Sequence, residues 1–198
     1  MATTEEPPPE PARRLFFALW PDEPMRQAMA QAIRETVRAS GGRPVMPANL
    51  HVTLAFLGSV PERRLPELAQ VARAAARDDA GEPLELSFDH LEYWRAAHLL
   101  CAAPAETSER TAALAGRLHS ALLRSVFAPD LKSSWSVEVG TTGPFRPHVT
   151  LARKVYRSPR TIEMQSVTWS FTDFVLVDSK TLPEGSVYTV LERFPLRH

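Results

Sequence analysis

The chain has 198 residues, of which 44% are hydrophobic and 23% are charged, and its 23 basic and 23 acidic residues give a formal net charge of zero. These values fit one soluble domain, or two small lobes that share a core, and they exclude a general positive excess for coating nucleic acid, although they leave room for a local basic groove. The single cysteine, Cys101, excludes an intramolecular disulfide and is predicted to be a small buried hydrophobe rather than a catalytic thiol, because leucines and alanines flank it.

Residues 1–13 are predicted to form a disordered tail, because they contain three consecutive prolines and several glutamates. Residues 14–198 are expected to form a single domain. No apolar run approaches the roughly 20 residues that span a bilayer, and the N-terminus lacks the basic and apolar regions of a secretory signal. The sequence therefore predicts a cytoplasmic protein without a membrane partner.

Apolar patterning predicts the elements of the chain. Short apolar or alternating runs indicate strands, apolar residues three or four apart indicate helices, and glycine and proline mark the ends of both. In chain order we expect a strand over 15–20, a helix over 22–40, an extended piece over 43–46, a strand over 50–57, a helix over 61–77, strands over 84–94 and 97–103, a helix over 106–127, a polar loop or edge over 133–143, and strands over 148–153, 167–177 and 187–194. Helices among hairpin-connected strands indicate an α+β fold rather than a doubly wound parallel sheet.

A pentapeptide, HVTLA, occurs twice, at residues 51–55 and 148–152. A repeat at about half the chain length suggests two similar lobes that each deliver one histidine to a shared place. Because side chains alternate along a strand, each copy should place its histidine, threonine and alanine on one face. The valine and leucine of each copy, and Phe56 after the first copy, should then face the core.

Two imidazoles and two hydroxyls that share a cleft suit a phosphodiester substrate. One histidine can take a proton from the attacking oxygen and the other can give a proton to the leaving oxygen, since an unperturbed pKa near about 6.5 allows both states near neutral pH. We predict His51 and His148 as catalytic residues, and Thr53 and Thr150 as donors to the phosphate oxygens. A merely polar strand face is disfavoured by the identical repeat, and a metal site by the lack of the third protein ligand that catalytic zinc usually has.

Basic residues surround the second motif. Between Val139 and Ile162 the chain has no acidic residue and five basic ones, Arg146, Arg153, Lys154, Arg157 and Arg160. Arg153 follows the motif directly and is the candidate for a phosphate contact, although strict alternation would point its side chain away from His148.

Other side chains have weaker claims. Three aromatic residues are candidates for stacking on a base, and the sequence does not choose among Phe56, Phe145 and Tyr156. Three further histidines are predicted to be surface or hydrogen-bonded residues, His90, His98 and His119.

The paired H-x-T motifs resemble those of the 2H phosphoesterase superfamily. Together with LFFALWP near the start, NLHVTLAFLG, FRPHVTLAR and VYTVLERFPL near the end, they resemble its RNA 2′,3′-cyclic phosphodiesterases, also called 2′-5′ RNA ligases. The resemblance covers nearly the whole chain after the tail. It implies a bilobal domain of two pseudo-symmetric α+β lobes, each with an antiparallel sheet lining a central cleft and helices outside. It also implies hydrolysis of a 2′,3′-cyclic phosphate RNA end to a 2′-phosphate, with no metal and no cofactor.

By position, the resemblance makes His51 the proton donor to the leaving 3′ oxygen and His148 the base that activates water, whereas the identical repeats alone assign neither role. The implied substrates are RNA ends with a 2′,3′-cyclic phosphate, tRNA fragments among them, or cyclic nucleotides, and the protein is expected to act as a monomer. The reverse reaction, 2′-5′ joining to a 5′-hydroxyl, is also implied. Two alternatives stay open: a related 2H activity on 2′-5′ oligoadenylates or a cyclic ADP-ribose phosphate, and a non-catalytic module that binds RNA ends.

Overall fold

The structure is a computed structural model, and it describes residues 10–77, 83–125, 145–158, 163–183 and 185–196. Its strands are β1 (Ala12–Leu19), β2 (Arg43–Pro44), β3 (Val52–Pro61), β4 (Leu84–Trp94), β5 (Leu99–Ala103), β6 (Val149–Arg153), β7 (Glu163–Phe171), β8 (Asp173–Leu182) and β9 (Gly185–Pro195). Its α-helices are α1 (Glu23–Ala32), α2 (Arg34–Ala39), α3 (Leu65–Arg77) and α4 (Glu109–Leu123). Single 3-10 turns cover Pro47–Asn49, Glu62–Arg64 and Arg95–Ala97.

The strands form one antiparallel sheet in the order β7-β4-β5-β6-β3-β1-β8-β9, with β2 beside β6. It divides into two four-stranded halves. The terminal lobe (β3, β1, β8 and β9) comes from the two ends of the chain, and the central lobe (β6, β5, β4 and β7) comes from the middle. The lobes meet between β3 and β6, where Val52 pairs with Val149. The predicted α+β fold with antiparallel strands is confirmed, and each motif strand is the innermost strand of its lobe.

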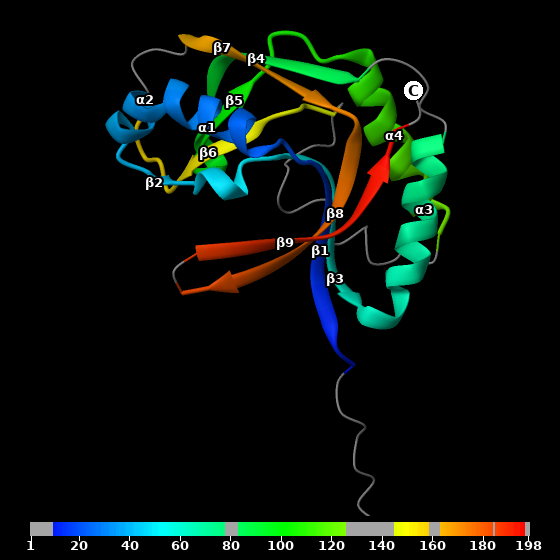
Figure 1. Ribbon diagram of the computed structural model, residues 1–198. Coiled ribbons are helices and arrows are strands. Elements are labelled where there is room, and N and C mark those ends of the chain that lie inside the picture. The colour runs from blue at the N-terminus through cyan, green and yellow to red at the C-terminus, as the bar shows by residue number, and fades with distance from the viewer. Residues whose placement is uncertain (1–9, 78–82, 126–144, 159–162, 184, 197–198) are drawn as a thin grey trace, which may run out of the picture.

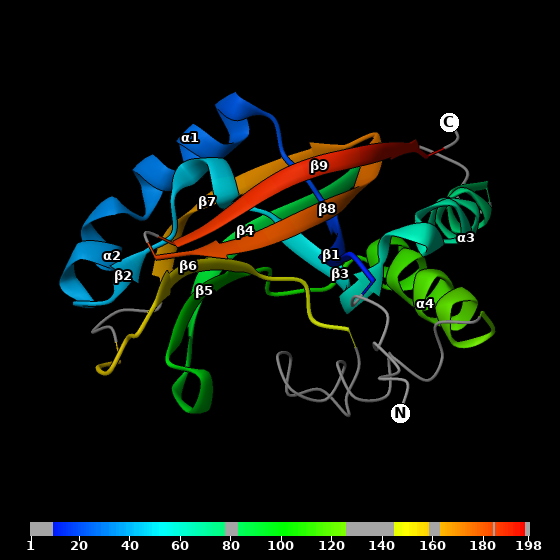
Figure 2. The same ribbon diagram turned by 90° about the horizontal axis from the view of Figure 1, so that it is seen from below.

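The main core lies between the helices and one face of the sheet. Helices α1 and α2 lie at one end of the molecule, and α3 and α4 pack side by side at the other end (Figures 1 and 2). Buried side chains from every one of these helices join apolar residues of both lobes in one cluster. Trp169 of β7 is fully buried, and its Nε1 donates to the backbone oxygen of Met25 at 3.1 Å, which ties the central lobe to α1.

The opposite face of the terminal lobe carries a second, smaller apolar cluster. Its buried members are Phe16, Ala18, Val175 and Val177, from β1 and β8. Because β1 also contributes Leu15, Phe17 and Leu19 to the main core, this strand is buried on both faces. That explains why its sequence reads as a continuous apolar run rather than as an alternating one.

The first strand begins before the predicted start of the domain. Residues 1–9 lie outside the described residues, but β1 already includes Ala12 and Arg13, which the sequence assigned to the tail. Arg13 pairs with Glu62 at 2.8 Å and with Asp178 at 3.2 Å, and the Asp178 side chain is nearly fully buried. These two ion pairs bind the first residues of β1 to β8 and to the turn after β3.

Two predicted elements are each divided in the structure. The helix predicted over 22–40 is divided at Ile33, which ends α1 and precedes α2, yet its buried stripe of Met29, Ile33 and Val37 continues into α2. The strand predicted over 167–177 is two strands, because the chain crosses from the central to the terminal lobe near Thr172. The loop predicted over 133–143 lies outside the described residues.

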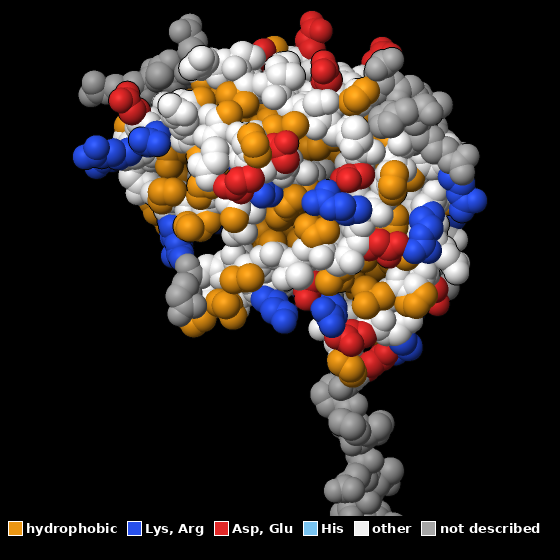
Figure 3. Space-filling model, viewed as in Figure 1, with side chains coloured by type: hydrophobic (Ala, Val, Ile, Leu, Met, Phe, Trp, Pro, Cys, Tyr) orange, Lys and Arg blue, Asp and Glu red, His pale blue; other side chains and the backbone are white. Residues whose placement is uncertain are grey.

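The surface agrees with the balanced charge of the chain. Basic and acidic side chains are interspersed over the face seen in Figure 3, with hydrophobic side chains between them. Over the described residues, no helix is both long enough and apolar enough to cross a membrane.

We expect Gly42→Ala to destabilise the protein by about 1–3 kcal/mol, because an overpacked site forces its neighbours to move. A Cβ atom at Gly42 would lie 2.9 Å from the backbone oxygen of Arg153 and would collide with Val155, next to the end of β6. The matched control is Gly116→Ala in α4, where a Cβ meets nothing within 4 Å and the change should stabilise by about 0.5–1 kcal/mol. Urea unfolding measures both changes, and equal stability of Gly42→Ala and the wild type would contradict this packing.

Candidate active site

The four predicted side chains come together where the lobes meet. The antiparallel pairing of Val52 with Val149, continued by one residue on each side, places Thr150 across from His51 and Thr53 across from His148. Cross-strand neighbours in such a pair have Cβ atoms about 5 Å apart. All four are half-buried, whereas Val52 and Val149 between them are fully buried in the main core.

A β-bulge lies at the same place in both motifs and corrects the predicted alternation. The register between β1 and β3 skips Leu54, and the register between β5 and β6 skips Leu151. A bulge puts two consecutive residues on one face, so the leucine and the alanine of each motif both enter the core. Ala55, which we expected in the cleft, is therefore a core residue, as is its counterpart Ala152.

The bulges also change the direction of the residue after each motif. Phe56, which was predicted to face the core, instead packs against the open-face cluster of the terminal lobe. Arg153 follows two core residues, so its side chain lies on the face of His148 and Thr150, not away from it, and its charge lowers the pKa of His51. Phe56 and Arg153 thus occupy equivalent positions in the two lobes.

Each histidine is held by the backbone two residues before it. His51 Nδ1 lies 2.7 Å from the backbone oxygen of Asn49, and His148 Nδ1 lies 2.9 Å from that of Arg146. A carbonyl oxygen can only accept, so each Nδ1 carries a proton and donates it. In the neutral imidazole Nε2 is then the acceptor, and His51 Nε2 lies 3.2 Å from the Thr53 hydroxyl. Both histidines are therefore set to exchange protons through Nε2.

Aromatic rings surround His51. Its imidazole lies 4.9 Å from Phe16, 5.4 Å from a stacked Trp20 and 5.3 Å from the edge of Tyr188, measured between ring centroids. Burial lowers the pKa of His51 to about 4, with smaller contributions from the charges of His148 and Arg153. The hydrogen bond to Asn49 opposes this change but does not cancel it, so His51 is neutral at pH 7.

Charged and polar groups surround His148 instead. The Trp94 ring lies 4.4 Å from the imidazole, and Glu92 and Arg146 lie at the same place and form an ion pair at 2.7 Å. Burial lowers the pKa of His148, the hydrogen bond to the Arg146 backbone and the Glu92 charge raise it, and the Arg146 charge lowers it further. These groups, with His90, line a pocket of about 140 Å³ beside His148.

Cys101 is buried beneath the second motif, as predicted. It pairs with Thr150 across β5 and β6, and its thiol is hydrogen-bonded to the Thr150 hydroxyl. Burial raises the pKa of Cys101 to about 12, so the thiol is protonated and holds Thr150 rather than reacting. Over the described residues, no group of three His, Cys, Asp or Glu side chains could hold a metal ion.

The structure distinguishes the other sequence candidates. Phe56 lies on the open face, with the Arg14 guanidinium 4.8 Å from its ring centroid. Phe145 packs against the main core, and Tyr156 lies beside the exposed His98. Lys154 and Arg157 are exposed beyond β6, and Arg160 lies outside the described residues.

The side chains that make the surroundings of the two histidines different were not predicted from the sequence. On the terminal lobe these are Trp20 and Tyr188, and on the central lobe they are Glu92 and Trp94. The alternation of His90, Glu92 and Trp94 along β4 was a usable signal, because it puts a carboxylate and two rings on one face. Nothing in the sequence alone indicated that this face meets His148.

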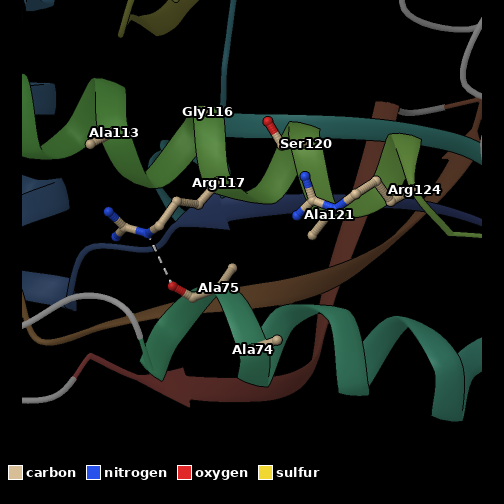
Figure 4. A pocket seen from close by; sticks show the side chains of 8 residues that line it. All are labelled: Ala74, Ala75, Ala113, Gly116, Arg117, Ser120, Ala121 and Arg124. Carbon is tan, nitrogen blue, oxygen red and sulfur yellow. Dashed lines mark hydrogen bonds between the residues drawn. The ribbon is translucent and has the colours of Figure 1, made fainter.

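A larger hollow, of about 460 Å³, lies away from the motifs, between α3 and α4 (Figure 4). Alanines and a glycine form most of its lining, and Arg117 Nε donates across it to the backbone oxygen of Ala75 at 3.3 Å. It therefore reflects the small residues at a helix–helix contact, whereas the candidate active site lies at the junction of the lobes.

Comparison with known proteins finds a matching family model, related sequences and similar solved structures. The family model described as the 2′-5′ RNA ligase superfamily matches residues 20–181. The chain is 34% identical over 190 residues to the RNA 2′,3′-cyclic phosphodiesterase of Thermus thermophilus (93% of this chain, 90% of the relative), and 27% identical over 186 residues to that of Escherichia coli (93% and 97%). Its structure is similar to a solved protein of Thermus thermophilus, with a TM-score of 0.77, 32% identity and coverage of 93% and 98% of the two chains. It is also similar to E. coli LigT complexed with 3′-AMP, with a TM-score of 0.76, 26% identity and coverage of 95% and 100%.

We expect the His51 imidazole to titrate near pH 4 in the folded protein and near about 6.5 in urea, because burial among aromatic rings disfavours its charged form. The unfolded state then binds more protons between these pH values. The His51 contribution to the free energy of unfolding is therefore complete above about pH 6.5 and is lost as the pH falls toward 4. NMR titration of the assigned His51 ring protons measures the midpoint, and a midpoint near 6.5 in the folded protein would contradict the buried environment.

Proposed function

Because the chain belongs to the 2′-5′ RNA ligase superfamily, we propose that it is an RNA 2′,3′-cyclic phosphodiesterase that uses His51 and His148 as its proton-transfer pair. The observation that carries the proposal is the facing arrangement of two His-x-Thr pairs at one strand junction. The reaction opens a 2′,3′-cyclic phosphate at an RNA end, or in a cyclic nucleotide, and leaves a 2′-phosphate.

The chemistry follows from the two Nε2 atoms. One neutral imidazole takes a proton from a water molecule as its oxygen attacks phosphorus, and the bond from phosphorus to the 3′ oxygen breaks. The other imidazole, in its protonated form, gives its Nε2 proton to that 3′ oxygen. The hydroxyls of Thr53 and Thr150 donate to the non-bridging oxygens, on which negative charge increases in the transition state. Side chains of this chain thus carry out both proton transfers and stabilise the developing charge, without a metal or a cofactor.

The substrate itself supplies the charge that the site requires. In the free protein burial holds the pKa of both histidines below the ordinary value, so both imidazoles favour the neutral form. An anionic phosphate between them favours a protonated neighbour, because an opposite charge within a few ångströms stabilises the charged form of a histidine. Binding of the cyclic phosphate should therefore bring one proton into the site.

The roles follow the family pattern by position, with His51 as the acid and His148 as the base. By microscopic reversibility the same pair can join a 2′,3′-cyclic phosphate end to a 5′-hydroxyl through a 2′-5′ bond. The name of the matching family supports this reverse reaction as a second activity of the same site. RNAs with each of these ends, incubated together and digested with a 3′-5′-specific nuclease, would reveal the resistant 2′-5′ product.

We expect the wild-type protein to convert 2′,3′-cyclic AMP to 2′-AMP, and His51→Ala and His148→Ala each to lose about 10²–10⁴-fold in kcat. Each variant removes one of the two proton transfers. Both variants should remain folded by circular dichroism, because the histidines are not part of the main core. EDTA should have no effect on the wild type. Chromatography of the products, with 2′-AMP and 3′-AMP as standards, measures both rate and regiochemistry.

The matched control for these variants is His119→Asn in α4, on the helix side of the sheet, which should retain wild-type activity. Full activity in either motif variant would refute the paired mechanism. Binding of 2′,3′-cyclic AMP without turnover would indicate a non-catalytic module. Faster turnover of 2′-5′ oligoadenylate or of a cyclic ADP-ribose phosphate would indicate the related 2H activity instead.

We expect Arg153→Ala to lower kcat/KM by about 10–100-fold, because a charge-assisted hydrogen bond to a phosphate contributes roughly 1.5–3 kcal/mol. The bulge at Leu151 supports this role, since it turns Arg153 toward the face of the histidines. Arg157→Ala, which removes an exposed arginine of the same basic run, should change kcat/KM less than about twofold. Steady-state kinetics measure kcat/KM for both variants. An equal loss in both would contradict a specific phosphate contact by Arg153 and indicate a general effect of the basic surface.

A further inference from the structure

One carboxylate, that of Glu92 in β4, holds both supports of the His148 imidazole. Its Oε2 accepts a hydrogen bond from Trp94 Nε1 at 2.6 Å, and its Oε1 accepts one from the Arg146 guanidinium at 2.7 Å. The Trp94 ring packs against His148, and the Arg146 backbone oxygen accepts the His148 Nδ1 proton. The imidazole is thus fixed on two sides by residues that share one anchor.

The surroundings of Glu92 keep its carboxylate charged. Glu92 is largely shielded from solvent, and although burial raises its pKa, the Trp94 hydrogen bond and the Arg146 charge lower it below the ordinary value. The carboxylate is therefore ionised at neutral pH and pairs with the charge of Arg146. Without Glu92, the Arg146 charge would lower the pKa of His148 with no opposing negative charge. The first motif differs, because aromatic rings pack around His51 where the second histidine has this ion pair.

We propose that Glu92 is a positioning residue for His148, which orients the imidazole through Trp94 and Arg146 and places a negative charge beside it. This inference rests on the proposed function, in which His148 is the base, and it names the residue that adapts one of two identical motifs to that task. A base works best when its proton affinity is close to the working pH, and a nearby carboxylate moves a buried histidine in that direction.

None of the other charged and titratable groups named here as neighbours of His148 places a negative charge directly beside its imidazole. Arg146, from the same segment, opposes protonation of His148. His90, two residues before Glu92 in β4, lies 3.5 Å from the Glu92 carboxylate and also contacts Asp89. Cys101 in β5 keeps its proton, and His51, just before β3, is neutral at pH 7. Arg153, at the end of β6, adds positive charge at the site.

The test measures the proton affinity of His148 directly, in the full chain. Glu92→Gln retains the size of the side chain and removes the charge, and it leaves the charge of Arg146 unpaired. We expect the NMR titration midpoint of the assigned His148 ring to fall by about half a unit to one unit, less than for a carboxylate in direct contact. Glu92→Asp, which retains the charge, should restore most of this midpoint. The control, Glu85→Gln, makes the same change at an exposed residue near the start of β4 and should leave the His148 midpoint unchanged.

Kinetics with 2′,3′-cyclic AMP give the second readout. In Glu92→Gln the acidic limb of the pH profile of kcat/KM should move down by the same amount as the NMR midpoint. We expect kcat to fall about three- to tenfold while KM changes less than about twofold, the pattern of a lost transition-state interaction. An unchanged His148 midpoint would overturn the proposal even if the enzyme is active. A shifted midpoint in a protein without turnover would support the role of Glu92 and refute the proposed function separately.

Discussion

The pairing of Val52 with Val149 fixes where the two motif strands meet, and the candidate site depends on it. Both valines are fully buried, so the register between β3 and β6 is set by the core and not by the polar residues above it. A slip of one residue would turn each histidine into the core and each valine out of it, which burial strongly disfavours. The hydrophobic side of the junction therefore aligns the polar side, and no contact between the histidines is needed to bring them together.

The residues around the junction differ between the two lobes. The open face of the terminal lobe is an apolar cluster capped by Trp20 and Tyr188, so the histidine there is desolvated without an acidic partner. The open face of the central lobe carries Glu92 and Arg146, so its histidine is desolvated beside charges of both signs. The two histidines, although they lie in identical pentapeptides, thus differ in proton affinity because their neighbours differ. In the proposed mechanism, the two faces make one histidine the acid and the other the base, while the repeated pentapeptide supplies both imidazoles.

Sequence reasoning reached the four polar side chains because they lie in a short repeat and precede the irregularity in each strand. The predicted alternation is wrong from the fifth motif residue onward, because a β-bulge at Leu54 and at Leu151 reverses it and leaves no mark in composition or propensity. The division of β7 from β8 changes the alternation, because the main-core residues are at odd positions in β7 (Trp169 and Phe171) and at even positions in β8 (Phe174 and Leu176). Side chains that approach from β4 and β9 were beyond reach, because only the long-range strand order brings them to the motifs.

The bulges have a consequence that links backbone geometry to chemistry. Because they occur at the same place, the fifth residue after each histidine turns to the open face in both lobes, and there the two lobes differ, with Phe56 in one and Arg153 in the other. Equal histidines on equal strands would compete for one proton with equal affinity, and a directional transfer requires that they differ. A cationic side chain on one lobe and an aromatic ring on the other break that symmetry beside the two candidate histidines. The same backbone irregularity, used twice, thus provides two places where substitution can make the halves of the site unequal without disturbing the core that aligns them.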